Sequence, residues 1–399
     1  MAVAEQDSDG VVADRLDPGG GDGAIAAGGG EHGERIALQF LAEFPGVGRG
    51  AHPPKPANGI VDSTAIRPFH VQAGRSVEVE ADGGGIVHGD DANRDGLLGA
   101  SAEPGLRTLP HMKHDPHGPG ARLAKRLGQA TAPVCVGLDP VVERMPPELA
   151  GLEPLEAVER FSLGVIDAVK GRVPCLKIQS ACYERYGHSG VATLERVIRA
   201  AVDAGFETIL DAKRGDIGIS ARHYAVAAAA TGAGWITLNG YLGEDGIIPF
   251  LEEGLGVFVL VRTSNPSGDE VQSPPCEGGT VASLVGRMVA RLGGTPAPGD
   301  VASVGAVVGA TKPDSARVLR EAMPRTPFLL PGYGAQGGGA DGVRAALDDA
   351  GGGVLVTASR SIIRAWEADG ADGAWTDSIA AAADRFVQEI ASVVGERIA

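Results

Sequence analysis

Residues 208–216 are Thr-Ile-Leu-Asp-Ala-Lys-Arg-Gly-Asp, an apolar stretch whose end carries several charged side chains. Asp211 and Lys213 are two residues apart, so on a β-strand their side chains point to the same face. Two charges at the end of a buried strand are costly unless they pair with each other. The stretch therefore predicts a strand over 208–213 with an ion pair at its carboxyl end. A purely structural salt bridge is one interpretation of that pair.

Seven more short apolar runs, rich in β-branched residues, lie between residue 119 and the end of the chain. They span 134–139, 175–179, 235–239, 257–263, 304–311, 328–331 and 354–359. Segments with helical spacing separate or follow most of them, at 155–170, 190–204, 220–231, 281–292, 314–322, 342–350 and 371–394. Eight apolar strands interleaved with helices predict an α/β fold, a closed parallel (β/α)8 TIM barrel over 119–399. A doubly wound open sheet is the alternative, which the lack of GxGxxG after the first strand disfavours.

The first 118 residues have a different composition from the rest of the chain. They hold 22 Gly and 9 Pro but neither Trp nor Tyr, and their glycine runs follow no period. So few apolar residues cannot offset the entropy of ordering, which predicts a disordered, low-complexity extension. Met112, just before a segment with helical spacing at 121–127, is a candidate for the true start of the chain.

The charge and composition of the chain exclude several classes of partner. A formal net charge of −16 at pH 7 disfavours binding to nucleic acid or to an anionic membrane surface. No apolar run is long enough to span a membrane, and the N-terminus lacks the pattern of a secretory signal. The four cysteines show no CxxC spacing, which predicts buried structural thiols and a reducing, cytoplasmic location. Seven of the nine histidines lie at or before His117, which argues against a histidine-built metal site or triad.

Polar residues stand where the predicted strands end, the place where a (β/α)8 barrel carries its active site. They are Asp139, Lys177, Asp211, Lys213, Asp216 and Asn239 on or after the first four runs, and the loops 263–266, 332–338 and 359–361 after the fifth, seventh and eighth. The alternating set Lys177, Asp211, Lys213 and Asp216 keeps every member charged without a metal ion. It places a cationic acid beside carboxylates, which suits protonation of a carbon on which negative charge develops.

The last two of these loops predict a phosphate site. Backbone N–H groups of the glycine-rich loop 332–338 and a helix start at Ser359 and Arg360 can bind an anion, and barrels often bind phosphate there. A glycine-rich loop with a solvated arginine is the simpler interpretation. The Pro/Gly-rich segment 263–279 is typical of a lid or binding loop, or else an inert turn. Simpler roles also exist for Asp139 as a helix cap, Asn239 as a turn residue and Gln336 as a solvated amide.

The segment Leu210-Asp-Ala-Lys-Arg-Gly-Asp-Ile-Gly218 resembles the Asp-x-Lys-x-x-Asp signature of the orotidine 5′-phosphate decarboxylase family. The resemblance covers roughly residues 119–397. Five further motifs occur in family order: Val136-Gly-Leu-Asp-Pro140, Lys177-Ile-Gln-Ser180, Thr263-Ser-Asn-Pro266, Pro331-Gly-Tyr-Gly-Ala-Gln-Gly-Gly338 and Ser359-Arg-Ser-Ile362. Together they look like the long bacterial, type 2 branch of that family. Residues 1–118 have no counterpart in it.

The resemblance implies a cofactor-free and metal-free enzyme that converts orotidine 5′-monophosphate to uridine 5′-monophosphate and CO2, the last step of de novo UMP synthesis. By this resemblance Lys213 protonates C6, Asp211 lies against the substrate carboxylate, and Lys177 bridges Asp211 and the ribose. Asp216 comes from the partner subunit of a homodimer with shared active sites. The implied substrate contacts are Asp139 with a ribose hydroxyl, Ser264 with the pyrimidine edge, Gln336 and Arg360 with the phosphate, and Ser220 with the ribose across the interface.

The chain departs from the family pattern at four positions, Ile178, Cys182, Tyr333 and Ser359, which affects the expected loop geometry and affinity rather than the reaction. Sister enzymes on this barrel, a hexulose-phosphate synthase or a keto-gulonate-phosphate decarboxylase, share Asp-x-Lys-x-x-Asp. They need Mg²⁺ and an acidic residue after the second strand, where this chain carries Lys177. A catalytically silent barrel used as a binding module is the alternative from a different class.

Overall fold

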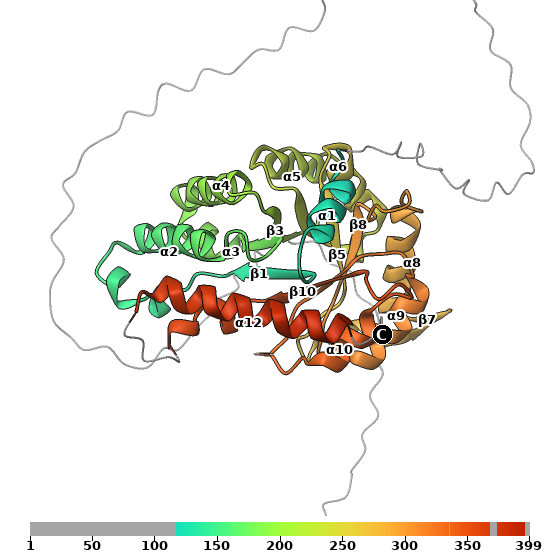
Figure 1. Ribbon diagram of the computed structural model, residues 1–399. Coiled ribbons are helices and arrows are strands. Elements are labelled where there is room, and N and C mark those ends of the chain that lie inside the picture. Colours follow the sequence, from blue (N-terminus) through green and yellow to red (C-terminus); the bar gives the residue numbers. More distant parts are fainter. Residues whose placement is uncertain (1–116, 335, 368–372, 396–399) are drawn as a thin grey trace, which may run out of the picture. The chain divides into compact units, whose positions relative to one another are not determined.

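A computed structural model describes residues 117–334, 336–367 and 373–395 of the chain (Figure 1). The predicted extension over 1–118 and the candidate start at Met112 lie outside these residues, apart from positions 117 and 118.

Eight parallel strands form a closed barrel in the order β1-β10-β9-β8-β5-β4-β3-β2. Their bounds are β1 Val134–Leu138, β2 Cys175–Gln179, β3 Glu207–Arg214, β4 Trp235–Asn239, β5 Gly256–Arg262, β8 Val304–Val308, β9 Phe328–Leu330 and β10 Val354–Ala358. Each strand lies on one of the eight predicted runs. The predicted TIM barrel is confirmed, and the open-sheet alternative is excluded because β1 pairs with both β2 and β10.

The inside of the barrel is a packed core to which every strand contributes one buried apolar side chain. These are Cys135, Cys175, Ile209, Trp235, Phe258, Val307, Leu329 and Leu355. Leu123 of α1 (Pro119–Gly128) joins this cluster. Trp235 stacks on Phe258 with ring centroids 4.7 Å apart, and a Cβ at Gly256 would lie 2.4 Å from the indole ring. Glycine at position 256 therefore makes room for the largest side chain of the core.

An outer layer of helices surrounds the strands (Figure 1). The main helices are α2 Pro154–Val169, α4 Gly187–Asp203, α5 Gly218–Ala230, α6 Ile248–Glu252, α8 Val281–Gly293, α9 Pro313–Ala322, α10 Ala340–Ala346 and α12 Trp375–Gly395. The C-terminal helix α12 packs along α2, where Trp375 stacks on Phe161 at 5.2 Å. The second apolar core of the molecule lies between these helices and the barrel.

Some predicted boundaries are wrong. Helix α6 was not predicted, because five residues are too few to show a helical period. The run 304–311 forms a strand only to Val308, where the pairing register with β5 shifts. The predicted helix 342–350 ends at Ala346, since Leu347 is extended and Asp348 accepts hydrogen bonds from the following turn. The predicted helix start at 371 is also too early, because α12 begins at Trp375.

The Pro/Gly-rich segment that follows β5 contains regular secondary structure. It contains the short helix α7 (Gly268–Gln272) and a hairpin of β6 (Pro275–Cys276) and β7 (Gly279–Thr280). Cys276 of this hairpin and Cys182 of the short helix α3 (Ala181–Glu184) are only half-buried, so the prediction of four buried thiols is wrong for these two. Cys135 and Cys175 are fully buried, and burial raises the pKa of the Cys135 thiol to about 12.

Candidate active site

A cavity of about 560 Å³ opens at the carboxyl ends of the strands. Of the ten predicted site residues, seven line it: Asp139, Lys177, Asp211, Lys213, Ser264, Gln336 and Arg360. Leu260, Val307 and Leu329 add an apolar wall. A cavity that is apolar on one side and carries converging charges on the other is typical of a small-molecule site.

The Asp211 carboxylate accepts four hydrogen bonds. Its Oδ2 accepts from Lys177 Nζ at 2.6 Å and from Gln179 Nε2 at 3.2 Å. Its Oδ1 accepts from Lys213 Nζ at 2.5 Å and from Thr237 Oγ1 at 2.8 Å. The ion pair predicted between Asp211 and Lys213 is therefore present, and a second lysine shares the same carboxylate.

These ion pairs fix the charges in the site. Burial alone would raise the pKa of Asp211, but Lys177 and Lys213 hold it at about 2. Burial alone would lower the pKa of Lys177, but Asp139 and Asp211 together raise it above its ordinary value. Lys177 Nζ lies 3.6 Å from Asp139 Oδ1. Near neutral pH Asp211 is therefore an anion and Lys177 a cation.

Lys213 has an unusual backbone for a residue that is not glycine, with φ of +47°. The pairing register between β3 and β4 shifts between Leu210 and Arg214, so the strand bulges where Lys213 leaves it. The Lys213 N–H donates to Thr237 Oγ1 at 3.0 Å. A strained residue that keeps its conformation must be held by its surroundings, and Thr237 is one such support.

Sequence analysis missed Gln179 and Thr237, although a signal for both exists. Gln179 is two residues after Lys177, and Thr237 is two residues after the inward-facing Trp235. Side chains two apart share a strand face, so both positions point into the barrel. Thr237 is 1% exposed, and its hydroxyl connects the backbone of Lys213 to the carboxylate of Asp211.

On the opposite rim of the cavity, Ser264 Oγ donates to Gln336 Oε1 at 2.9 Å. This contact joins the loop after β5 to the glycine-rich loop after β9. Tyr333 of the glycine-rich loop is buried and donates to Glu389 of α12 at 2.6 Å. Burial and this hydrogen bond raise the pKa of Tyr333, so it remains a donor. Arg360 begins the short helix α11 (Arg360–Ile363), beside the same loop.

Three predicted site residues do not line the cavity of their own chain. Asp216 follows β3, and its Oδ1 accepts from the N–H of Ile217 at 2.8 Å. Ser220 lies on α5, half-buried. Asn239 caps the turn after β4 by accepting from the N–H of Tyr241 at 3.0 Å, the simpler role weighed for it above. Their contacts with a substrate stay predictions.

Of the four departures from the family pattern, two line the cavity and two pack in or against the core beside the barrel. Ile178 is fully buried in the core between barrel and helices, and Cys182 packs partly against that core. Ser359 lies directly against Gly137 of β1, where an added Cβ would be 1.8 Å from its hydroxyl. Tyr333 and Ser359 line the cavity, whereas Ile178 and Cys182 do not.

Comparison with known proteins decides the family. The profile of the Orotidine 5'-phosphate decarboxylase / HUMPS family matches residues 132–371. This chain belongs to the orotidine 5′-phosphate decarboxylase family. An orotidine 5′-phosphate decarboxylase of Rhodopirellula baltica is 39% identical over 290 residues, which are 66% of this chain and 95% of that protein. One of Haloarcula marismortui is 41% identical over 251 residues, 62% of this chain and 87% of that protein.

Solved structures agree with this assignment. The structure of Leishmania donovani OMP decarboxylase is 30% identical with a TM-score of 0.57, and the alignment covers 71% of this chain and 99% of that one. The resemblance to the decarboxylase family drawn from six motifs is thus confirmed.

Among the described helices of this family member, none has the length and apolar character needed to cross a membrane. Within the same residues, no group of three or more His, Cys, Asp or Glu is arranged to hold a metal ion.

Proposed function

We propose that the protein converts orotidine 5′-monophosphate to uridine 5′-monophosphate and CO2, as a carboxy-lyase of pyrimidine biosynthesis. The observation that carries this proposal is the Asp211 carboxylate held between Lys177 and Lys213 in the barrel cavity. The family assignment supports the same reaction.

The chemistry needs an acid beside a carbanion. The bond between C6 and the carboxylate breaks, CO2 leaves, and the electron pair stays on C6. Lys213 Nζ, whose side chain is 45% exposed at the cavity, gives its proton to C6 and is reprotonated by solvent. Asp211 fixes the ammonium group at 2.5 Å, so the acid is in place before the charge develops.

Substrate binding divides between the two rims of the cavity. On one rim Asp139 Oδ1 is buried and, among the described residues, has no hydrogen-bond partner, so it can accept from a ribose hydroxyl. On the other rim Ser264 serves the pyrimidine edge, and Gln336 and Arg360 serve the phosphate. The phosphate is remote from C6, so its binding energy can be used to close the loops and favour the transition state.

We also propose a homodimer in which each site receives Asp216 and Ser220 from the partner chain. Asp216 is directed into its own turn rather than into its own cavity. Large apolar side chains are exposed on the segments near Asp216. Ile217 precedes α5, Ile219, Tyr224 and Val226 lie on α5, and Tyr241 and Leu242 follow β4. Several large exposed apolar side chains on neighbouring segments of the chain favour a protein interface. For the cell compartment we propose the cytoplasm, because all four cysteines are free thiols.

The loss of orotidylate absorbance on mixing with the purified protein tests the activity. We expect turnover that survives dialysis against EDTA, because Lys177, Lys213 and the carboxylates balance their charges without an ion. A silent barrel gives no turnover at all. Activity that vanishes with EDTA and returns with Mg²⁺ would instead favour a metal-dependent sister enzyme.

Thr237 provides a milder test of the same site. Thr237→Val removes the hydroxyl but keeps the shape of the side chain. The hydrogen bonds to the Lys213 backbone N–H and to the Asp211 carboxylate are then lost, so we expect kcat to fall by about 10- to 100-fold. Thr237→Ser keeps the hydroxyl and should retain most of the parent kcat. Steady-state kinetics on orotidine 5′-monophosphate measure both variants. A valine variant with the parent kcat would show that Asp211 and Lys213 hold their positions without Thr237.

A further inference from the structure

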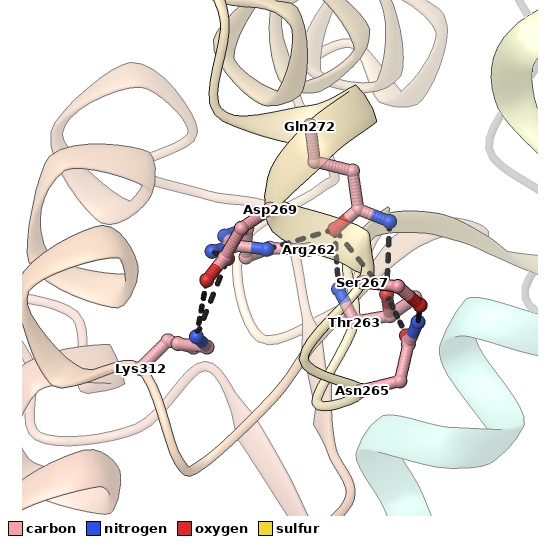
Figure 2. Close-up of polar contacts among 7 residues, drawn as sticks. All are labelled: Arg262, Thr263, Asn265, Ser267, Asp269, Gln272 and Lys312. Atoms are coloured by element: carbon pink, nitrogen blue, oxygen red, sulfur yellow. Dashed lines mark hydrogen bonds and ion pairs between the residues drawn. The ribbon is translucent and has the colours of Figure 1, made fainter. Parts of the chain in front are cut away.

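A cluster of polar side chains lies at the foot of the loop that carries Ser264, outside the Lys–Asp network. Figure 2 shows these side chains gathered between the end of β5, helix α7 and the loop that follows β8. They are Arg262, Thr263, Asn265, Ser267, Asp269, Gln272 and Lys312. Thr263, Ser264 and Asn265 line the cavity, so this cluster lies directly next to the substrate site.

The side-chain amide of Gln272 holds the two residues that precede Ser264. Its Oε1 accepts from Arg262 Nη1 at 3.0 Å and from the Thr263 N–H at 2.9 Å. Its Nε2 donates to Thr263 Oγ1 at 2.8 Å. One amide on α7 therefore binds both the side chain that ends β5 and the backbone that begins the loop.

Asp269 ties the same helix to the end of β5 and to the loop that follows β8. Its carboxylate pairs with Arg262 and with Lys312, whose Nζ lies 3.0 Å away. Arg262 is 4% exposed, so its charge depends on partners within the protein. The hydrogen bonds from Arg262 and then Lys312 lower the pKa of Asp269, which keeps the pairing carboxylate charged.

Ser264 itself fits into a narrow seat formed by two glycines. A Cβ on Gly309 would lie 3.2 Å from Ser264 Cα, and one on Gly332 would lie 3.6 Å from Ser264 Cβ. The Gly309 N–H donates to the Arg262 carbonyl at 2.7 Å. Gln272 and Asp269 therefore anchor the start of the loop, and the segments that follow β8 and β9 confine Ser264.

We infer that Gln272, Arg262 and Asp269 are positioning residues for nucleotide recognition: they hold Ser264 in its binding position before the substrate arrives. This inference rests on the proposed function, because it assigns Ser264 to the pyrimidine. A loop ordered in advance costs less entropy to bind, so the anchor lowers KM. Lys213 and Asp211 are not part of the anchor, so kcat changes little when the anchor is lost.

Gln272→Leu removes all of the amide's hydrogen bonds at similar size. We expect KM for orotidine 5′-monophosphate and Kd for uridine 5′-monophosphate to rise about 10-fold, as for the loss of two or three modest hydrogen bonds, with kcat within threefold of the parent. Gln272→Glu keeps an acceptor for Arg262 and Thr263, whose hydroxyl can donate to it from 3.2 Å, and should restore most of the affinity. Glu270→Gln, exposed on the same helix, is the matched control.

Hydrogen exchange of the Thr263 and Ser264 amides in the ligand-free protein gives a readout independent of catalysis, and Gln272→Leu should speed it up. Parent turnover tests the proposed function separately. Unchanged KM, Kd and exchange in Gln272→Leu would overturn the inference, and so would a Gln272→Glu variant no better than leucine. If the leucine variant fails to fold, Asp269→Asn, a change at a half-exposed carboxylate, takes its place with the same expected results.

Discussion

Replacing Lys213 by alanine should lower turnover of orotidine 5′-monophosphate by roughly 10³-fold or more, because a positioned general acid is typically worth two to four orders of magnitude. Lys177 cannot replace it, because it is 6% exposed and already bound between Asp139 and Asp211. Rapid-mixing or absorbance kinetics measure the loss. Lys125→Ala, an exposed lysine on α1, is the control and should keep the parent rate.

The Lys213 variant should still fold, since Asp211 keeps Lys177, Gln179 and Thr237 as partners. Its acid stability should change in a defined direction. In the parent, the stability due to the Asp211 ion pairs is complete above the ordinary pKa of 3.8 and is lost as the pH falls through about 2. Without Lys213 the pKa of Asp211 moves up toward 3.8, so the fall in melting temperature below pH 3.8 that is due to Asp211 should be smaller and should end at a higher pH. Turnover within tenfold of the parent, about 1.4 kcal/mol, would contradict the role of Lys213.

Asp216→Ala should abolish most activity although Asp216 lies outside its own cavity, if each site is completed by the neighbouring chain. The test mixes this inactive chain with the inactive Lys213→Ala chain and lets subunits exchange. In a mixed dimer, one site collects both defects and the other has both residues intact. Half of the dimers are mixed and half of their sites are whole, so activity should rise from near zero toward about a quarter of the parent level.

Exchange itself is checked by mass, with one chain carrying a tag. The control pairs Lys213→Ala with Lys177→Ala, two residues that line the same cavity of one chain, and this mixture should stay inactive. If exchange is complete and the Asp216 mixture also stays inactive, Asp216 serves its own chain and the shared-site proposal fails.

The sequence alone predicted the barrel because each of its strands is a short apolar run with a clear boundary. The central site was predictable for the same reason: charged residues at the ends of such runs, as in Asp211 and Lys213, stand out against their surroundings. Short elements escaped prediction, since α6 and α7 have five residues each and show no period. Thr237 was not predicted because a threonine is ordinary in a strand. Only the bulge after Leu210 brings its hydroxyl into hydrogen bonds with both the Lys213 N–H and the Asp211 carboxylate.

Contacts between distant loops were also beyond sequence analysis. Gln272 and Thr263 are nine residues apart within a segment that looked like a plain connection, and their pairing depends on how α7 folds back. Lys312 meets Asp269 only because β5 and β8 are neighbours in the closed barrel. Such pairings follow from the assembled fold and have no local pattern that marks them.

The left-handed backbone of Lys213 sets the stability of the folded chain against the proposed catalytic role of the same residue. A left-handed conformation costs an ordinary residue roughly 1 kcal/mol that glycine does not incur. A glycine at 213 would relax the bulge but remove the ammonium group, so the substitution that suits the chain best locally eliminates the proposed proton donor. Directed evolution for heat resistance without a screen for turnover should therefore drift toward glycine at this site, and a stabilised variant of this barrel needs its gains elsewhere.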